Sequence, residues 1–81
     1  MKVHVRFFAA LREVLGEEEL DLDLPDGTTV SALWDQLQTK NSSLAPYDRS
    51  VQFAINHDFV GRDTELSADD EVAFLPPVSG G

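Results

Sequence analysis

The sequence contains no cysteine. This absence excludes disulfide bonds, zinc-thiolate and iron-sulfur sites, and any nucleophile or persulfide carried by a cysteine side chain. Basic residues are also scarce: 6 lysines and arginines stand against 15 aspartates and glutamates, for a formal net charge of -9. Because such a chain repels a phosphate backbone, we expect no nucleic-acid partner, and basic protein surfaces suit it better.

Long apolar runs are missing as well. No stretch approaches the roughly 20 apolar residues that a membrane-spanning helix requires, so no membrane partner is expected. The first residues, MKVHVRFF, alternate basic and apolar side chains and do not have the pattern of a signal peptide, which favours a cytoplasmic location. A chain of 81 residues suffices for one hydrophobic core.

The spacing of the apolar residues predicts the order of the secondary-structure elements. A period of two residues is typical of strands, and a spacing of three and four is typical of helices. The prediction is a strand at 2–8, a short helix at 9–15, a strand at 19–24, a main helix starting at Thr28 or Thr29 and including Leu37, a loop at 42–50, a strand at 51–55, a short extended piece at 59–60, a loop at 61–70 and a last strand at 71–75.

The short helix has one apolar face, formed by Ala10, Leu11, Val14 and Leu15. Gly16 follows it, as a glycine does at many helix ends. The segment is therefore predicted to be a short helix.

The fold class predicted from this order is α+β, a mixed sheet packed on one main helix. We expect four aromatic side chains in the core: Phe7, Trp34, Phe53 and Phe74. The other face of the sheet is expected to be wet, and by their place in the alternation Phe8 and Leu75 lie on it. Exposed apolar residues on such a face are candidates for a partner-binding surface.

The last six residues are Pro76, Pro77, Val78, Ser79, Gly80 and Gly81. They divide the chain into a domain at 1–75 and a flexible tail at 76–81. The prolines favour an extended path of roughly 3.1 Å per residue, which carries the end on the order of 15 Å from the domain. The glycines lack side chains and therefore suit a narrow channel. A Gly-Gly end by itself equally describes a frayed terminus, but its combination with the prolines and the preceding strand favours a functional tail.

The reactive group of such a tail is the carboxylate of Gly81. Its pKa of roughly 3.5 keeps it ionised at neutral pH, so it is a poor electrophile. An ATP-dependent enzyme would convert it to an acyl-adenylate, and a sulfur donor would then displace AMP and leave a terminal thiocarboxylate. This chemistry gives a covalent sulfur carrier without a cysteine.

Three segments carry a family resemblance that covers essentially the whole chain: VRFFAALRE, DGTTVSALWDQL and LSADDEVAFLPPVSGG. With these the chain resembles the molybdopterin synthase small subunits, the MoaD family, among the sulfur carriers that also include ThiS. The resemblance implies a ubiquitin-like β-grasp fold. It also implies that Phe8, Phe59 and Leu75 bind the partners, with Arg12 either pairing with a partner acid or serving as a plain surface arginine.

The resemblance further implies a reaction cycle in which this chain is not an enzyme on its own. A MoeB-like, E1-like adenylating enzyme would use MgATP to activate Gly81. A MoaE-like large subunit, in a heterotetramer of two small and two large subunits, would supply the catalytic residues. The thiocarboxylate would donate sulfur to cyclic pyranopterin monophosphate to form the molybdopterin dithiolene. No tightly bound cofactor or metal is expected, and His4 and His57 are interpreted as surface histidines.

Other functions remain open at this point. The same tail would suit a ThiS-like or tRNA-thiolation sulfur carrier. It would also suit a ubiquitin-like protein modifier that is joined to lysine side chains. A third alternative is a module that only binds other proteins and carries out no covalent chemistry.

Overall fold

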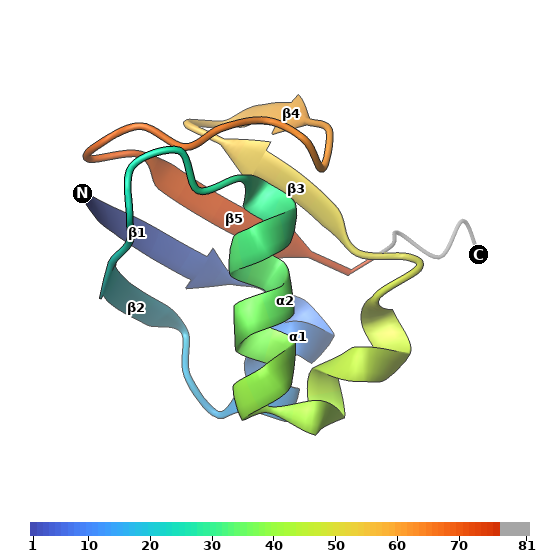
Figure 1. The fold of residues 1–81 in the computed structure, drawn as a ribbon. Helices are drawn as coiled ribbons and strands as arrows, with labels where there is room; N and C mark the ends of the chain where they lie inside the picture. The colour runs from blue at the N-terminus through green and yellow to red at the C-terminus, as the bar shows by residue number, and fades with distance from the viewer. Residues whose placement is uncertain (77–81) are drawn as a thin grey trace.

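A computed structural model describes residues 1–76, so the part of the predicted tail at 77–81 lies outside the described residues (Figure 1). The division into a domain at 1–75 and a tail at 76–81 therefore stays a prediction. The elements are β1 (Lys2–Phe7), α1 (Ala9–Leu15), β2 (Glu19–Asp23), α2 (Val30–Lys40), the 3-10 helix η1 (Ser42–Tyr47), β3 (Gln52–Ile55), β4 (Asp58–Val60) and β5 (Glu71–Leu75).

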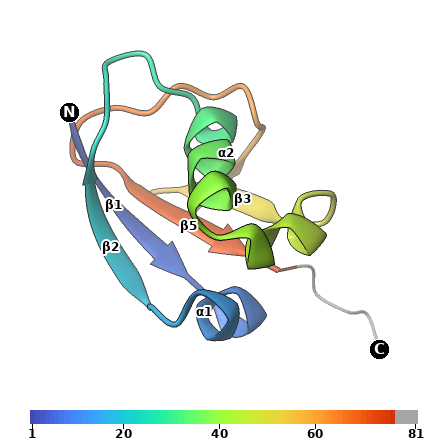
Figure 2. The same cartoon turned by 60° about the horizontal axis from the view of Figure 1, so that its bottom comes forward.

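The five strands form one mixed sheet in the order β2-β1-β5-β3-β4. The central pair β1 and β5 is parallel, and the other three pairs are antiparallel. Helix α2 lies across one face of the sheet, and β2 is the strand at one edge of the sheet (Figures 1 and 2). The predicted α+β class, a mixed sheet packed on one main helix, is confirmed.

Alternation decides which strand residues enter the core. Val3, Val5 and Phe7 of β1 are at most 1% exposed, whereas the residues between them are exposed or half-buried. The parallel register places Phe7 opposite Phe74, so both rings project from the same face of the sheet. This inner face is the one that packs on α2.

The four aromatic residues predicted for the core are all at most 4% exposed. The Phe74 ring is the centre of the cluster, with ring centroids 5.7 Å from Phe7, 5.2 Å from Trp34 and 5.5 Å from Phe53. The Phe53 ring meets Phe74 edge-on, at an interplanar angle of 83°, which is a favourable arrangement for aromatic rings. The cluster joins α2 to the middle of the sheet.

Both helix-end predictions are confirmed. Gly16 has a φ of 79° and its N–H donates to the Arg12 carbonyl at 2.9 Å, so it ends α1 in the left-handed conformation that glycine adopts without strain. Thr29 precedes α2, and its hydroxyl oxygen accepts a hydrogen bond from the Ala32 N–H at 3.2 Å.

The predicted short helix is confirmed as α1. Leu11 is fully buried, and Leu15, one turn further on, is partly buried and packs against the core, whereas Val14 is 37% exposed. The core therefore covers only part of the apolar face of α1.

The prediction of a loop at 42–50 was wrong for its first six residues, which form η1. One buried residue, Leu44, anchors this helix in the core. The six residues SSLAPY show no clear helical period in the sequence, so only the tertiary packing reveals the helix. Short helices of this kind are also typical connectors. A second hidden core residue, Leu66, lies in the segment predicted as a loop at 61–70 and is 5% exposed.

Asp48 ties the segment after η1 to the main helix. Its Oδ1 accepts hydrogen bonds from Trp34 Nε1 at 2.8 Å and from Gln38 Nε2 at 3.1 Å, and Arg62 donates to both its carboxylate and its backbone carbonyl. The Trp34 hydrogen bond, followed by the charge of Arg62, lowers the pKa of Asp48 below its ordinary value of 3.8. These contacts satisfy the N–H of a fully buried indole.

Within residues 1–76, none of the helices has both the length and the apolar character needed to cross a membrane.

Candidate functional site

The outer face of the sheet carries an apolar cavity at the centre of four strands. Arg6 and Ala73 are opposite each other in β1 and β5, Ala73 is opposite Ala54 in β3, and Ala54 is opposite Phe59 in β4. Residues directly opposite in neighbouring strands project from the same face. The register therefore brings side chains from distant parts of the sequence into one row.

This cavity has a volume of about 170 Å³. Ala54 and Ala73 have the shortest side chains of its lining, and larger side chains surround them. The lining consists of Arg6, Phe8, Ala54, His57, Phe59, Glu71, Ala73 and Leu75. The three residues predicted as partner-binding, Phe8, Phe59 and Leu75, are thus brought together in one place, which we call the outer-face patch.

Phe8 reaches the patch because it continues the alternation of β1 past the end of the strand. Its φ of -121° and ψ of 150° are extended, and its N–H donates to the Phe74 carbonyl at 3.3 Å. Its own carbonyl accepts a hydrogen bond from the Leu11 N–H at 3.1 Å, where α1 begins. Phe8 is therefore held at both its backbone groups and half-buried, with its side chain on the outer face.

Phe59 reaches the patch through the hairpin between β3 and β4. Asn56 and His57 form its turn with φ values of 49° and 76°, and two positive φ values in succession are typical of the tight turns that match the twist of a hairpin. The Phe59 side chain is 70% exposed, the largest exposure of any large apolar residue in the described part of the chain. An aromatic ring left in water in this way is a candidate for burial against a partner.

Leu75 lies at the end of β5, opposite Gln52 of β3, and is half-buried. It is the last strand residue before Pro76, which is also half-buried. The patch is therefore adjacent to the point where the chain enters the predicted tail, whose members Pro77, Val78, Ser79, Gly80 and Gly81 lie outside the described residues.

Arg6 contributes a charged side chain to the lining of the outer-face patch. Its Nη1 donates to Glu71 Oε1 at 3.3 Å, its Nε lies 3.6 Å from Glu19 Oε1, and its Cζ lies 5.0 Å from the centroid of the Phe8 ring. The Nε atom is buried without a hydrogen-bond partner. Two carboxylates and one aromatic face thus hold a single guanidinium in place.

Sequence reasoning missed Arg6, Ala54 and Ala73 as members of the site. The alanines carried a signal, because they are small residues at outward positions between larger apolar neighbours. Arg6 carried none beyond its outward place in β1. Arg12, by contrast, lies on α1 with its Nη1 3.7 Å from Glu18 Oε1, and it does not line the cavity.

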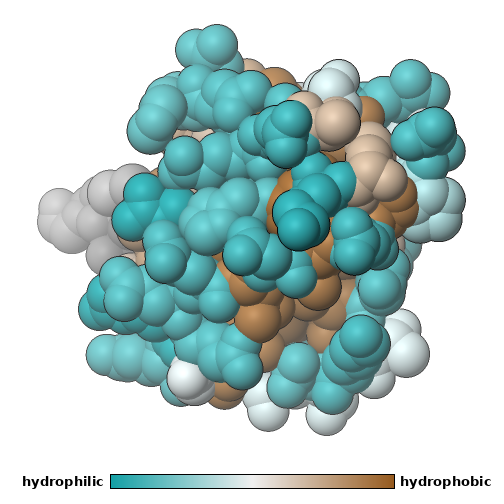
Figure 3. Space-filling view, turned by 90° about the vertical axis from the view of Figure 1, so that its left-hand side faces the viewer, coloured by the Kyte–Doolittle hydropathy of each residue, from teal (hydrophilic) through white to brown (hydrophobic). Residues whose placement is uncertain are grey.

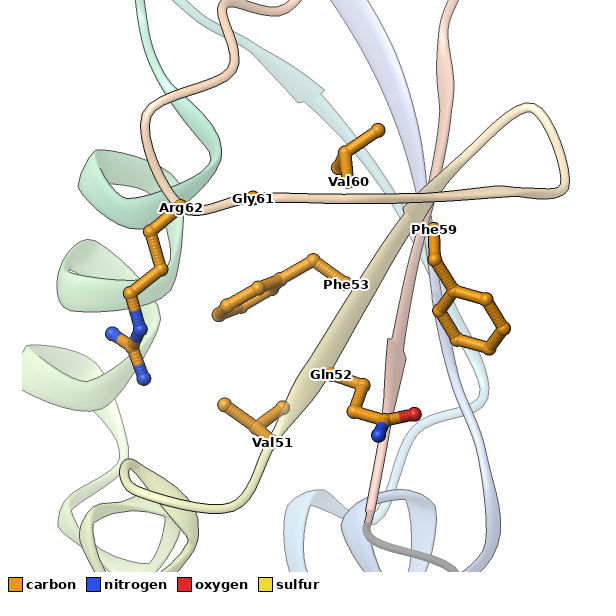
Figure 4. Close-up of a pocket in the computed structure, with 7 residues that line it drawn as sticks. All are labelled: Val51, Gln52, Phe53, Phe59, Val60, Gly61 and Arg62. Carbon is orange, nitrogen blue, oxygen red and sulfur yellow. The ribbon is translucent and has the colours of Figure 1, made fainter.

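A second cavity of about 420 Å³ is lined by residues 51–53, at the start of β3, and 59–62, at the end of β4 and just after it (Figure 4). Figure 4 shows Phe59 and Gln52 on one side of the hairpin, and Phe53 and Arg62 on the other. The Arg62 Cζ lies 5.2 Å from the Phe53 ring centroid. Phe59 lines both cavities, so a partner that covers it contacts the margin of each.

Among residues 1–76, no group of three histidine, aspartate or glutamate side chains is arranged to hold a metal ion. His4 instead lies between two carboxylates, with Nδ1 2.7 Å from Asp21 Oδ1 and Nε2 3.3 Å from Glu19 Oε1. The Asp21 hydrogen bond and then the Glu19 hydrogen bond raise the pKa of His4 above 6.5. His57, in the β3–β4 turn, is exposed and lines the outer-face cavity.

Several known proteins are similar to this chain. A sequence model described as the ThiS family matches residues 5–81. The molybdopterin synthase sulfur carrier subunit of Mycobacterium tuberculosis is 40% identical over 82 residues, covering 100% of this chain and 99% of that protein.

Two solved structures are also similar to the chain. A chain in the complex of subunits 1 and 2 of molybdopterin-converting factor from Helicobacter pylori is 27% identical, with a TM-score of 0.72 and full coverage of both chains, 100% and 100%. Small archaeal modifier protein 1 from Methanosarcina acetivorans is 32% identical, with a TM-score of 0.80, covering 99% of this chain and 96% of that one. The predicted β-grasp architecture is shared with these proteins.

Proposed function

The chain belongs to the ThiS family, and from this premise we propose that it is the sulfur-carrier small subunit of a molybdopterin synthase. The full-length similarity to the M. tuberculosis sulfur carrier subunit supports the assignment. In this role the chain supplies the reacting group and a docking surface, and the large subunit supplies the catalytic residues. We place the cycle in the cytoplasm.

The observation that carries the proposal is the position of Leu75. This side chain lines the outer-face patch and belongs to the last residue of β5. A partner that covers the patch is therefore next to the start of the six-residue segment that ends in Gly81. A partner that docks on the patch is therefore also placed to receive the chain end.

The chemistry is assigned to the main-chain end because the sequence has no cysteine to carry sulfur on a side chain. In the first step the Gly81 carboxylate attacks the α-phosphate of ATP, pyrophosphate leaves, and an acyl-adenylate forms. In the second step sulfur at the sulfide level, as hydrosulfide, attacks the acyl carbon, AMP leaves and the sulfur loses its proton. The product is a thiocarboxylate at Gly81. An E1-like, MoeB-like adenylating enzyme binds the MgATP, and this chain needs no tightly bound cofactor.

Delivery takes place in the large subunit. The thiocarboxylate sulfur attacks a carbon of cyclic pyranopterin monophosphate and displaces an oxygen substituent of that carbon, which forms a thioester between the carrier and the pterin. Water then cleaves the acyl C–S bond of this thioester, so the sulfur stays on the pterin and the carrier is released with a Gly81 carboxylate. Two such transfers complete the dithiolene of molybdopterin. The similarity to a chain in the H. pylori complex of subunits 1 and 2 supports a large-subunit partner, and we infer a heterotetramer of two small and two large subunits.

Intact mass spectrometry tests the proposal. The full chain is incubated with MgATP, an E1-like adenylating enzyme and a sulfur source, and its mass is expected to rise by the exchange of one oxygen for sulfur. Addition of a large subunit and the cyclic pterin should then return the carrier to its starting mass and yield molybdopterin. A carrier that never gains sulfur under these conditions would refute the proposal.

A protein modifier is the second candidate, because small archaeal modifier protein 1 of M. acetivorans is 32% identical to this chain. The same incubation distinguishes the two functions. A modifier would form isopeptide-linked conjugates with lysine side chains of added proteins, whereas the proposed carrier would transfer sulfur and remain unattached.

A further inference from the structure

One margin of the sheet, the free edge of β2, is separate from the outer-face patch. Among the described residues, β2 has a strand beside it on one side only, because it ends the order β2-β1-β5-β3-β4. An edge of this kind presents unpaired backbone N–H and C=O groups, to which an extended chain binds readily. Nothing in the proposed sulfur chemistry uses this edge.

The register identifies which residues present those groups. Val3 pairs with Leu22 and Val5 with Leu20, and the ladder continues with hydrogen bonds of 3.0 Å from Phe7 N–H to the Glu18 carbonyl and 2.8 Å from Leu24 N–H to the Met1 carbonyl. In an antiparallel pair, alternate residues exchange hydrogen bonds with the neighbouring strand. The even-numbered residues of β2 therefore bond to β1. The backbone groups of Glu19, Asp21 and Asp23 point away from β1, to the free edge.

An apolar groove runs beside the same edge on the inner side of the sheet. It has a volume of about 270 Å³ and is lined by four leucines, Leu15, Leu20, Leu22 and Leu37, with the charged Glu17 and Lys40 at its rim. Leu20 and Leu22 are only half-buried. Figure 3 views the molecule from this side, and apolar surface is visible there between hydrophilic residues. Side chains of an added strand opposite Leu20 and Leu22 would enter this groove.

The outward side chains of β2 are all acidic. They are Glu19, Asp21 and Asp23, and the first two are 53% and 67% exposed at the side chain. Strand β1 already pairs basic side chains with these acids, since Lys2, His4 and Arg6 lie opposite them in register. Between these basic residues, the apolar residues Val3, Val5 and Phe7 of β1 point inward. The free side of β2 offers the same alternation of acidic and leucine side chains to a second neighbour.

We propose that the free edge of β2 binds an extended segment of a partner protein that alternates basic and aliphatic residues and adds to the sheet as a further strand. Its basic residues face Glu19, Asp21 and Asp23, and its aliphatic residues enter the leucine groove. A second copy of this chain is the wrong occupant, because pairing two β2 edges would bring two rows of carboxylates together. None of the β2 residues lines the outer-face cavity, and the edge adjoins the patch where Glu19 lies 3.6 Å from Arg6.

A peptide titration tests the proposal. The probe is the acetylated and amidated heptapeptide Lys-Val-Arg-Val-Lys-Val-Arg, added to the full-length 15N-labelled chain at low ionic strength. The largest shifts are expected at the amides of 19–23 and of the groove leucines, and added NaCl should weaken binding because the contacts are partly ionic. A peptide of equal composition with its basic and aliphatic residues in separate blocks should bind roughly tenfold more weakly, since it retains the charge but loses the register.

Comparison of two variants separates the contribution of a backbone hydrogen bond from that of the charge. Asp21→Pro deletes an N–H that points to the free edge and spares the β1 ladder, and Asp21→Ala is its matched control because it loses the same carboxylate and keeps the N–H. The proline variant should bind the peptide more weakly than the alanine variant. If the proline variant does not fold, N-methylation of the peptide at its basic residues makes the same test on the unaltered protein.

Three results would overturn the proposal. The first is an absence of shifts at the β2 edge, with or without shifts at the outer-face patch. The second is equal binding of the alternating, block and N-methylated peptides. The third is a dimer of the free chain that Asp21→Pro abolishes, which would assign the edge to self-association.

Discussion

The Arg6 guanidinium lies over the Phe8 ring, with Cζ 5.0 Å from the ring centroid. The two residues are on the same face of the sheet because Phe8 continues the extended path of β1. Glu71 and Glu19 fix the guanidinium from two sides, at 3.3 Å and 3.6 Å. Phe8 is thus held in position before any partner arrives, and a pre-positioned side chain loses little conformational entropy on binding.

Arg6→Lys is expected to weaken binding of the large subunit about two- to fivefold, since a cation over an aromatic ring at a partly exposed site is worth about 0.5–1 kcal/mol and lysine lacks the planar guanidinium. The measurement is isothermal titration calorimetry. Arg12→Lys is the matched control, because Arg12 does not line the cavity. Equal affinities for the Arg6 variant and the parent chain would show that Arg6 does not position the patch.

Phe59→Asp is expected to weaken docking of the large subunit by about 2 kcal/mol, or roughly thirtyfold, as replacement of a central aromatic residue in an interface does. Because Phe59 is 70% exposed in the free chain, the substitution should change the free energy of unfolding of the protein by less than about 0.5 kcal/mol. Calorimetry and urea unfolding measure the two effects. Val14→Asp is the control, since Val14 is an exposed apolar residue away from the patch.

Phe8→Asp and Leu75→Asp should weaken docking as well. Both side chains are half-buried, so a small loss of stability accompanies the loss of binding. Complete unfolding of either variant would place that residue in the core and remove it from the partner-binding surface.

Deletion of Gly81 is expected to abolish sulfur transfer and leave the melting temperature unchanged, because the described core contains no residue beyond Phe74. The measurements are intact mass after incubation with the activating enzyme, and thermal unfolding. Ser79→Ala is a control that keeps the chain length and the Gly-Gly end. A truncated chain that still supports molybdopterin formation would contradict the tail mechanism.

Asp48 is expected to make the fold sensitive to acid. The Trp34 hydrogen bond lowers the pKa of Asp48 below 3.8, so its stabilising effect is present above pH 3.8 and is lost as the pH falls through the lower pKa of the folded state. Asp48→Ala should therefore lower the melting temperature at neutral pH, and the difference from the parent chain should shrink in acid. Melting curves at several pH values measure it. A difference that does not depend on pH would show that the charge of Asp48 has no part in stability.

His4 should respond to pH in the opposite sense. Asp21 and then Glu19 raise its pKa above 6.5, so the stabilising effect is present below pH 6.5 and is lost as the pH rises through the raised pKa of the folded state. Glu71, opposite His4 in β5, adds a further negative charge on the same face. NMR titration of the imidazole ring should give a midpoint above 6.5, and Asp21→Asn should lower it. A midpoint at or below 6.5 in the parent chain would contradict the hydrogen bond.

The parts of the fold that were predictable depend on short-range pattern. Val3, Val5 and Phe7 are buried because residues two apart share one face of a strand, and Thr29 and Gly16 bound their helices through contacts three or four residues away. The η1 helix was not predictable, because Leu44 is its only buried residue and its burial depends on elements far away in the chain.

The candidate site likewise has features that could be predicted from the sequence and features that could not. The absence of cysteine, the Gly80-Gly81 motif and the outward positions of Phe8 and Leu75 can be read from the sequence alone. The fold was needed to see that Ala54 and Ala73 line one cavity with Phe8, Phe59 and Leu75, that the Arg6 guanidinium lies over the Phe8 ring, and that Glu19, Asp21 and Asp23 present a free edge. Alternation along a strand specifies which face a residue is on, whereas strand order and register specify its neighbours, and these depend on contacts between residues distant in the sequence.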